Sequence, residues 1–229
     1  MSWLRVLGKF LISVGVGFLL FVAWTLWGTG LYTAQQQDRL REELSRLPEI
    51  EPEEKTSKDG REFVGPGESF DPDLGEPVFA LSIPAIDVSD VVVQGVGEEE
   101  LKLGPGHYPD CAPGVPEGLC TDFEEVWPGE AGPVIVSGHR TTYSEPFGEL
   151  DKLRAGDEIV TDTRWGEFTY KVRDIEIRPA PVKLSEILSP RLASSGAQQP
   201  EAEMILTTCN PKFSAAERLI VYAELEDVT

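Results

Sequence analysis

Residues 204–225 read MILTTCNPKFSAAERLIVYAEL, and this stretch decides both the fold and the chemistry that we expect. Two apolar runs rich in β-branched residues, 204–209 and 218–225, flank a polar segment, a pattern typical of two neighbouring antiparallel strands. Cys209 ends the first run and Arg218 begins the second, so their side chains are expected to meet about 5 Å apart at Cβ. The pattern predicts a guanidinium beside a thiol at one end of a sheet.

An arginine beside a thiol has a chemical use. It is permanently charged and carries several donors, so Arg218 can favour the thiolate of Cys209 and stabilise an oxyanion on a bound carbonyl. Two other interpretations stay open: Arg218 pairs with Glu217 or Glu224 at the surface, or Cys209 is a buried apolar residue without chemistry.

The chain contains two histidines, His107 and His139. His139 follows the apolar strand 134–136 and Gly138, a position typical of an active-site group on a rigid support. His107 lies in GPGHYP and is expected to pack or hydrogen-bond locally. We therefore favour His139 as the base. A zinc site formed by Cys209 and His139 is the alternative, but it lacks the third and fourth ligands that zinc usually has.

Short β-like segments separated by turn signals continue on both sides of these residues. About eight strands in roughly 150 residues predict an all-β fold, an eight-stranded barrel that is closed or nearly closed. Brief helical patterns are expected at 98–103, 146–153 and 185–188. The predicted strands are 78–83, 91–94, 134–139, 158–163, 167–172, 175–178, 204–209 and 218–225.

The N-terminal stretch 10–27, FLISVGVGFLLFVAWTLW, carries no charged residue. As a helix it would span roughly 27 Å at about 1.5 Å per residue, enough to cross a bilayer. Arg5 and Lys9 precede it, and Trp24 and Trp27 lie at its far end, which favours a cytoplasmic N-terminus. The prediction is an uncleaved transmembrane anchor. A cleavable signal peptide is the alternative, although the apolar run is long for one.

Composition divides the chain into three parts: a cytoplasmic tail with the anchor at 1–33, a helical stalk with an acidic linker at 34–77, and the folded domain at 78–229. Within the second part, 49–77 mixes acids with Pro and Gly and is expected to be a flexible linker. The 20 basic and 40 acidic residues give a net charge of −20, which makes nucleic acid an unsuitable partner.

Three cysteines are present. Cys111 and Cys120 lie close together in a Pro- and Gly-rich insertion, so their pairing as a disulfide would leave Cys209 free. Such a bridge would contribute about 2–3 kcal/mol to stability by restricting the unfolded chain. The alternative is two reduced thiols on a disordered insertion.

These motifs resemble one family. The run LTTCNP at 206–211, followed by Arg218, resembles the sortase signature in which a cysteine ends one strand and an arginine begins the next. SGHRTTY at 137–143 is similar to the sortase histidine segment, and GPGHYP and LSIP extend the resemblance over 78–229. The doubled threonines and the GHRTTY form are most similar to class E sortases of high-GC Gram-positive bacteria.

The resemblance implies a sortase-like barrel and a cysteine transpeptidase. Sortases cleave a sorting signal of the Leu-Pro-x-Thr-Gly or Leu-Ala-x-Thr-Gly kind between Thr and Gly, and transfer the secreted protein to a cell-wall amine. It implies that Cys209 is the nucleophile, His139 the acid and base, and Arg218 the oxyanion donor, with substrate contacts from Thr207, Thr208 and Tyr143. This chemistry requires no metal or organic cofactor; some sortases bind calcium, for which no convincing ligand set is evident here.

Other functions remain open beside this one. An L,D-transpeptidase-like enzyme also uses cysteine and histidine on a β-scaffold, but the arginine nine residues after Cys209 favours the sortase interpretation. A pilin-polymerising sortase would use a lysine amine as acceptor. A non-catalytic, membrane-tethered binding domain is the alternative from another class. In each case we expect a single-pass membrane protein with an extracytoplasmic domain.

Overall fold

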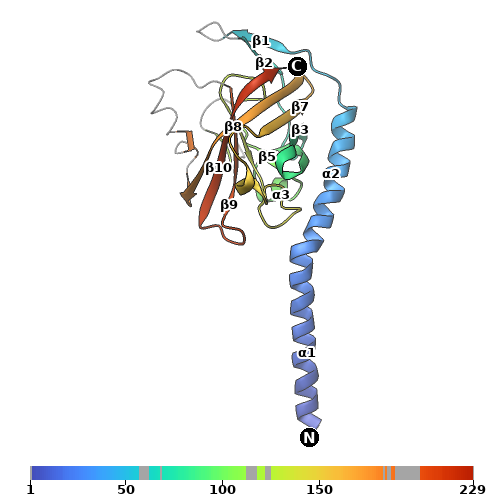
Figure 1. The fold of residues 1–229 in the computed structure, drawn as a ribbon. Coiled ribbons are helices and arrows are strands. Elements are labelled where there is room, and N and C mark those ends of the chain that lie inside the picture. The colour runs from blue at the N-terminus through green and yellow to red at the C-terminus, as the bar shows by residue number, and fades with distance from the viewer. Residues whose placement is uncertain are drawn as a thin grey trace.

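The structure is a computed structural model that describes residues 2–56, 62–67, 69–111, 118–121, 125–182, 184, 187–188 and 202–228. Its centre is a closed β-barrel with the strand order β10-β8-β7-β3-β4-β5-β6-β9 (Figure 1). This confirms the all-β, eight-stranded prediction. The strands are β3 (Pro77–Ile83), β4 (Val88–Gln94), β5 (Gly106–His107), β6 (Pro133–Ser137), β7 (Glu158–Thr163), β8 (Gly166–Pro179), β9 (Glu203–Asn210) and β10 (Glu217–Val228).

The strand count agrees with the prediction, but two assignments differ. The segments expected at 167–172 and 175–178 form one strand, β8, in which Arg173 is the extra residue of a bulge opposite β10. A bulge bends a strand without ending it, so its sequence resembles a turn between two strands. The strand β5 was not predicted. Its two residues pair with β4 on one side and with β6 on the other.

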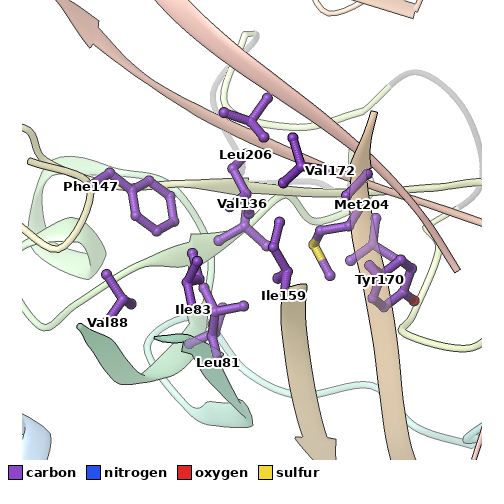
Figure 2. Close-up of a cluster of buried hydrophobic side chains, with 14 of the residues drawn as sticks. Leu81, Ile83, Val88, Val136, Phe147, Ile159, Tyr170, Val172, Met204 and Leu206 are labelled. Atoms are coloured by element: carbon purple, nitrogen blue, oxygen red, sulfur yellow. The ribbon is translucent and has the colours of Figure 1, made fainter. Parts of the chain in front are cut away.

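Strand alternation separates the inside of the barrel from the outside. Val136 of β6 and Met204 and Leu206 of β9 are fully buried and point into the interior, where they meet Leu81, Tyr170 and Val172 (Figure 2). The alternate residues of the same strands point outward. Every second residue at the end of β9 is therefore available for a site on the outer surface.

A second apolar cluster covers part of that outer face. Ile135, Ile205, Ile220 and Tyr222 point out from β6, β9 and β10 and are buried. The chain that follows β8 packs over them through Val182, Leu184, Ile187 and Leu188. The outer face of these three strands is thus an apolar floor that leads toward Cys209.

The short helices largely follow the predicted positions. A helical turn, α3, spans Glu98–Leu101, and a 3₁₀ turn, η3, spans Leu150–Lys152. A further 3₁₀ turn, η2 (Pro84–Ile86), joins β3 to β4. The pattern expected at 185–188 lies partly outside the described residues; 187 and 188 are helical.

The N-terminal region is one long helical rod that projects from the barrel (Figure 1). It consists of α1 (Ser2–Ala23), a π-helical turn η1 (Trp24–Gly28) and α2 (Thr29–Arg46). The 21 residues Trp3–Ala23 are long and apolar enough to cross a membrane. This candidate span begins earlier than the predicted run at 10–27 and includes the charged residues Arg5 and Lys9.

The prediction that 49–77 is a flexible linker is wrong for the parts that the structure describes as strands. β1 (Glu53–Thr56) and β2 (Glu62–Gly65) form a two-stranded antiparallel sheet. Phe63 is buried, and the Phe70 ring lies 4.7 Å from that of Trp127. The segment has few apolar residues, but Ile50, Val64 and Phe70 pack against the core of the barrel, and composition alone does not reveal this.

Cys111 and Cys120 form a disulfide with a Cα–Cα distance of 4.9 Å, and Cys209 is free. Both predictions about the cysteines are confirmed. The bridge links the two described ends of the insertion near the isolated pairing of Asp110 with Thr121. It lies away from the strand ends that carry Cys209 and Arg218.

We expect that replacing both bridge cysteines, Cys111→Ala with Cys120→Ala, lowers the free energy of unfolding by about 2–3 kcal/mol, because the unfolded chain gains loop entropy. Urea unfolding of the full chain measures this. Dithiothreitol should shift the wild type to the same midpoint and leave the variant unaffected. Equal midpoints for the oxidised wild type and the variant would contradict the prediction.

Candidate active site

Cys209 and Arg218 lie directly opposite each other on adjacent antiparallel strands. The β9–β10 register pairs Cys209 with Arg218, and Thr208 with Leu219. Directly opposed residues have Cβ atoms about 5 Å apart and side chains on the same face. That face is the outer one, shared with Ile205 and Ile220. The predicted meeting of thiol and guanidinium is therefore present in the backbone register.

His139 leaves the neighbouring strand at the same end. β6 runs parallel to β9, pairing Ser137 with Thr207, and the Gly138 N–H donates to the Thr207 carbonyl at 3.2 Å. Two residues farther along each chain stand His139 and Cys209. Adjacent strands lie about 4.8 Å apart, so the three functional groups project from three neighbouring strand ends.

Glycine at 138 is required by packing. A Cβ at this position would stand 2.7 Å from the Phe147 ring, which is fully buried. The Phe147 N–H also donates to the His139 carbonyl at 3.0 Å and closes the loop that follows the histidine. Gly138 thus lets the strand exit lie flat on the core while His139 points outward.

His139 is largely buried, and its Nε2 atom has no hydrogen-bond partner among the described residues. Its ring lies 5.0 Å from that of Tyr143, tilted by 32°. Burial lowers the pKa of His139 below its usual 6.5; Glu98 raises the pKa and Lys102 lowers it, both to a smaller extent. An unpaired buried imidazole nitrogen of lowered pKa is suited to exchanging protons with a reactant.

His107 has a structural role. Its Nδ1 lies 3.1 Å from Gln94 Oε1 and its Nε2 lies 3.0 Å from the Val126 carbonyl. The ring packs 4.4 Å from that of Trp127 and is 1% exposed. With both nitrogens engaged, His107 is a core residue, as expected from its motif.

Arg218 lies half-buried beside Cys209. Its Nη1 donates to the carbonyls of Ala215 and Glu217 at 3.3 and 3.1 Å. Burial raises the pKa of Tyr108, whereas a hydrogen bond with Ser137 and the positive charge of Arg218 both lower it. Because Arg218 acts on the same tyrosine as Ser137, its guanidinium lies near the end of β6.

The carboxylates that offered Arg218 an alternative have other partners. The Glu217 side chain accepts from Asn210, and Glu224 pairs with Arg173. The competing interpretation of Arg218 as a surface ion-pair residue therefore loses its two candidate partners.

Comparison with known proteins places this geometry in a family. The Sortase domain model matches residues 81–226. The chain belongs to the sortase family of cysteine transpeptidases.

Individual relatives agree with this family assignment. Sortase SrtE1 of Streptomyces coelicolor is 33% identical over 223 residues, covering 96% of this chain but only 56% of the relative's length. Sortase D of Bacillus subtilis is 29% identical and covers 96% of this chain and 98% of the relative. The resemblance to class E sortases is thereby confirmed.

Solved structures show the same fold. The crystal structure of Sortase E1 from Streptomyces coelicolor with a tripeptide in the active site is 32% identical, with a TM-score of 0.54, covering 67% of this chain and 90% of that one. Sortase E from Streptomyces avermitilis is 31% identical, with a TM-score of 0.53, covering 69% and 93%.

The three residues of this sortase predicted to contact substrate lie in different environments. Thr207 is on the same face as Cys209 but buried, and Tyr143 packs against His139. Thr208 points to the opposite face, and its hydroxyl donates to the Gly138 carbonyl at 2.7 Å. The placement of Thr208 conflicts with a substrate contact; its hydroxyl joins the nucleophile strand to the histidine segment instead.

A polar network that the sequence does not predict lies behind the site. Arg140 is 5% exposed and donates through Nη1 to the Cys209 carbonyl at 3.3 Å and to the Asn210 side chain. Its Nη2 lies 3.0 Å from the Asp151 carboxylate, and Asn210 donates to Glu217. Each of Arg140, Asn210 and Glu217 is the chain neighbour of one of the three functional residues.

These contacts hold the ends of β6, β9 and β10 together. Arg140 has the fork geometry to hold two acceptors at fixed positions, which a lysine does not have. In the sequence, this role of Arg140 is indicated by its position as a charged residue directly after His139, at the end of a buried strand. Its partners lie about 70 positions away, so the pairing was not evident from the sequence alone.

The described residues contain no group of three or more His, Cys, Asp or Glu side chains arranged to hold a metal ion. The zinc alternative would need further ligands beside Cys209 and His139.

We expect Arg140→Met to lower kcat/KM for peptide cleavage by roughly tenfold to a hundredfold, because the cysteine and histidine segments lose their shared clamp. The matched control is Arg173→Met, which breaks an exposed ion pair with Glu224 far from the site. Steady-state kinetics on both variants checks this. Equal activity of the two variants would remove the clamp role.

The lowered pKa of His139 predicts a pH-dependent stability. The unfolded chain protonates this histidine first, so its contribution is fully present above about pH 6.5 and is lost as the pH falls through the folded-state pKa. Urea unfolding of wild type and His139→Gln between about pH 7.5 and pH 5 measures it. The wild type should lose more stability on acidification than the variant; parallel curves would exclude a lowered pKa.

Proposed function

We propose that this chain is a sortase that cleaves a sorting signal of the Leu-Ala-x-Thr-Gly or Leu-Pro-x-Thr-Gly type between Thr and Gly, and transfers the protein to a peptidoglycan amine. The observation that carries the proposal is the register that pairs Cys209 with Arg218, with His139 leaving the next strand at the same end. Sortases act on sorting-signal substrates and cell-wall amines.

The first half-reaction breaks the peptide bond. The Cys209 thiolate attacks the Thr carbonyl carbon, and the oxygen takes up negative charge beside Arg218. His139, protonated, gives its proton to the departing glycine amine as the C–N bond breaks. The products are a thioester at Cys209 and the released glycine peptide.

The second half-reaction restores the enzyme. Neutral His139 takes a proton from the incoming acceptor amine, whose nitrogen attacks the thioester carbon. The C–S bond breaks, the new amide is released, and Cys209 returns to a thiolate beside imidazolium. No metal or organic cofactor takes part in this scheme.

The surroundings of the three residues support a peptide substrate. The apolar floor of Ile135, Ile205 and Ile220 leads along the outer face toward Cys209. Because the chain that follows β8 covers this floor, we assign the substrate to the strand ends beyond it, with Thr207 and Tyr143 beside the reacting bond. A secreted protein with an extended C-terminal signal would lie along the strand ends.

The location follows from the N-terminal helix. We propose that α1 anchors the chain as a single pass in the cell membrane, with residues 78–229 forming an extracytoplasmic catalytic domain. Arg5 and Lys9 precede the most apolar part of the helix, which fits a cytoplasmic N-terminus. Residues 34–77 connect the anchor to that domain.

The proposal is tested by incubating the full chain with both signal peptides and measuring its mass. The wild type should gain the mass of the acyl fragment, and an added stem-peptide amine should release it. Cys209→Ala should form no adduct, while Cys111→Ala with Cys120→Ala should still form one. Arg218→Lys should slow cleavage by roughly 10²–10³-fold, because the bidentate donor is lost.

The outcomes separate the remaining functions. Unchanged turnover in Cys209→Ala would exclude Cys209 as the nucleophile, whereas no turnover by the wild type would leave a membrane-tethered binding domain. Release of the adduct by a pilin lysine peptide in preference to a stem-peptide amine would make the chain a pilin-polymerising sortase.

A further inference from the structure

Helix α2 is fixed to the barrel by a buried glutamine. Gln37 is 4% exposed; its Nε2 donates to the carbonyls of Val91 and Leu103, both at 2.9 Å, and its Oε1 accepts from the Val91 N–H at 2.6 Å. One turn later, Leu40 packs on Val91 and Val93. Three hydrogen bonds from one buried side chain specify both the position and the rotation of the helix.

The preceding turns of the same helix reach the loops around the active site. The Thr33 hydroxyl donates to the Lys102 carbonyl at 2.8 Å. The Thr29 hydroxyl accepts from the Tyr143 N–H at 3.3 Å, and the Ser144 hydroxyl donates to the Gly30 carbonyl at 2.9 Å. Figure 1 shows α2 alongside the barrel, next to α3.

Both segments held in this way act on His139, one by contact and the other through its charges. Tyr143 packs its ring against the imidazole, while Glu98 of α3 and Lys102, which follows α3, act on its charge. The helix therefore contacts the backbone of both segments that form the surroundings of His139, although it does not contribute a group to the reaction.

The Tyr143 segment needs such support. Tyr143, Ser144 and Glu145 are consecutive non-glycine residues with φ values of 53°, 63° and 42°. L-residues disfavour the left-handed region, and three in a row persist only where the surroundings hold them. Two of these three residues hydrogen-bond to α2.

We infer that α2 is a positioning element of the active site: through Gln37, Thr33 and Thr29 it holds the Tyr143 and Lys102 segments around His139, so the membrane anchor and the catalytic histidine form one rigid unit. The inference deepens the proposed function and rests on it. Thr29 lies six residues beyond Ala23, a rise of roughly 9 Å. The histidine loop is thereby held at the membrane surface, where a sorting signal and a lipid-linked amine would both be presented.

The test uses the full chain in lipid nanodiscs with two pairs of variants. Gln37→Ala removes the buried amide, and exposed Gln35→Ala is its control. Thr29→Val removes the hydroxyl that accepts from Tyr143, and Thr25→Val is its control, because the Thr25 hydroxyl bonds only within the helix, to the Phe21 carbonyl. Thr29→Ser keeps the hydroxyl and should restore wild-type behaviour.

Two readouts are expected to move together. Gln37→Ala and Thr29→Val should lower kcat for peptide cleavage by roughly tenfold, with a smaller change in KM, because the histidine is misplaced and binding is largely kept. With isotope-labelled histidine, the NMR titration midpoint of His139 should rise toward 6.5, since looser packing relieves its burial. The His107 signal should stay unchanged.

The outcomes keep this inference separate from the proposed function. If wild type forms no adduct, the proposed function fails, whereas the His139 titration still reports on the helix contact. If neither Thr29→Val nor Gln37→Ala moves that titration or kcat, the helix only attaches the domain and the inference is wrong. If Gln37→Ala unfolds, the comparison of Thr29→Val with Thr29→Ser decides.

Discussion

The rest of the structure depends on the antiparallel register of β9 and β10. A shift of β9 by one residue would turn Cys209 into the barrel and bring Thr208 to the outer face, because side chains alternate along a strand. The register is held by burial on both sides: Met204, Leu206, Leu219 and Val221 fill the interior, while Ile205 and Ile220 are covered outside. A thiol and a guanidinium are thus brought together by packing over the whole length of two strands, and no local turn motif is needed to align them.

The histidine is added to this pair by the parallel neighbour β6, and its alignment depends on polar contacts. Parallel strands leave the sheet in the same direction, so His139 and Cys209 emerge at one end. Thr208 and Arg140 then connect the two exits through the Gly138 and Cys209 carbonyls. These bonds join backbone groups that lie next to the functional residues and leave the Cys209 thiol free. The Nε2 atom of His139 lacks a described partner, as expected of a group whose partner is the reactant.

Features that depend on residues close together in the chain are predicted from the sequence, whereas features that depend on contacts between distant residues are not. The β9–β10 hairpin and the Cys111–Cys120 bridge both follow from residues within short windows, and the structure agrees with both. The strand β5 has two residues, too few for a periodic signal. The sheet formed by β1 and β2 lies in a segment whose composition predicts a linker, because an apolar residue there, such as Phe70, gains a structural role only through a distant partner such as Trp127. The pairing of Arg140 with Asn210 joins positions far apart in sequence, for which a single sequence offers no signal.

Because the N-terminal helical rod is continuous, a helix and not a flexible stalk connects the proposed anchor to the barrel. A flexible stalk would let the domain sample many orientations, and the site would meet its substrates by tethered diffusion. Here the helical rod runs from Ser2 to Arg46, and its second half is bonded to the barrel beside the histidine loop. Figure 1 shows the β9–β10 turn at the end of the barrel toward which α1 projects. In the proposed arrangement the site is held close to the end of the apolar span, so it would meet membrane-held substrates at the height where they are concentrated. A fixed orientation limits the reach of the enzyme, but it suits reactants that are confined to the same surface.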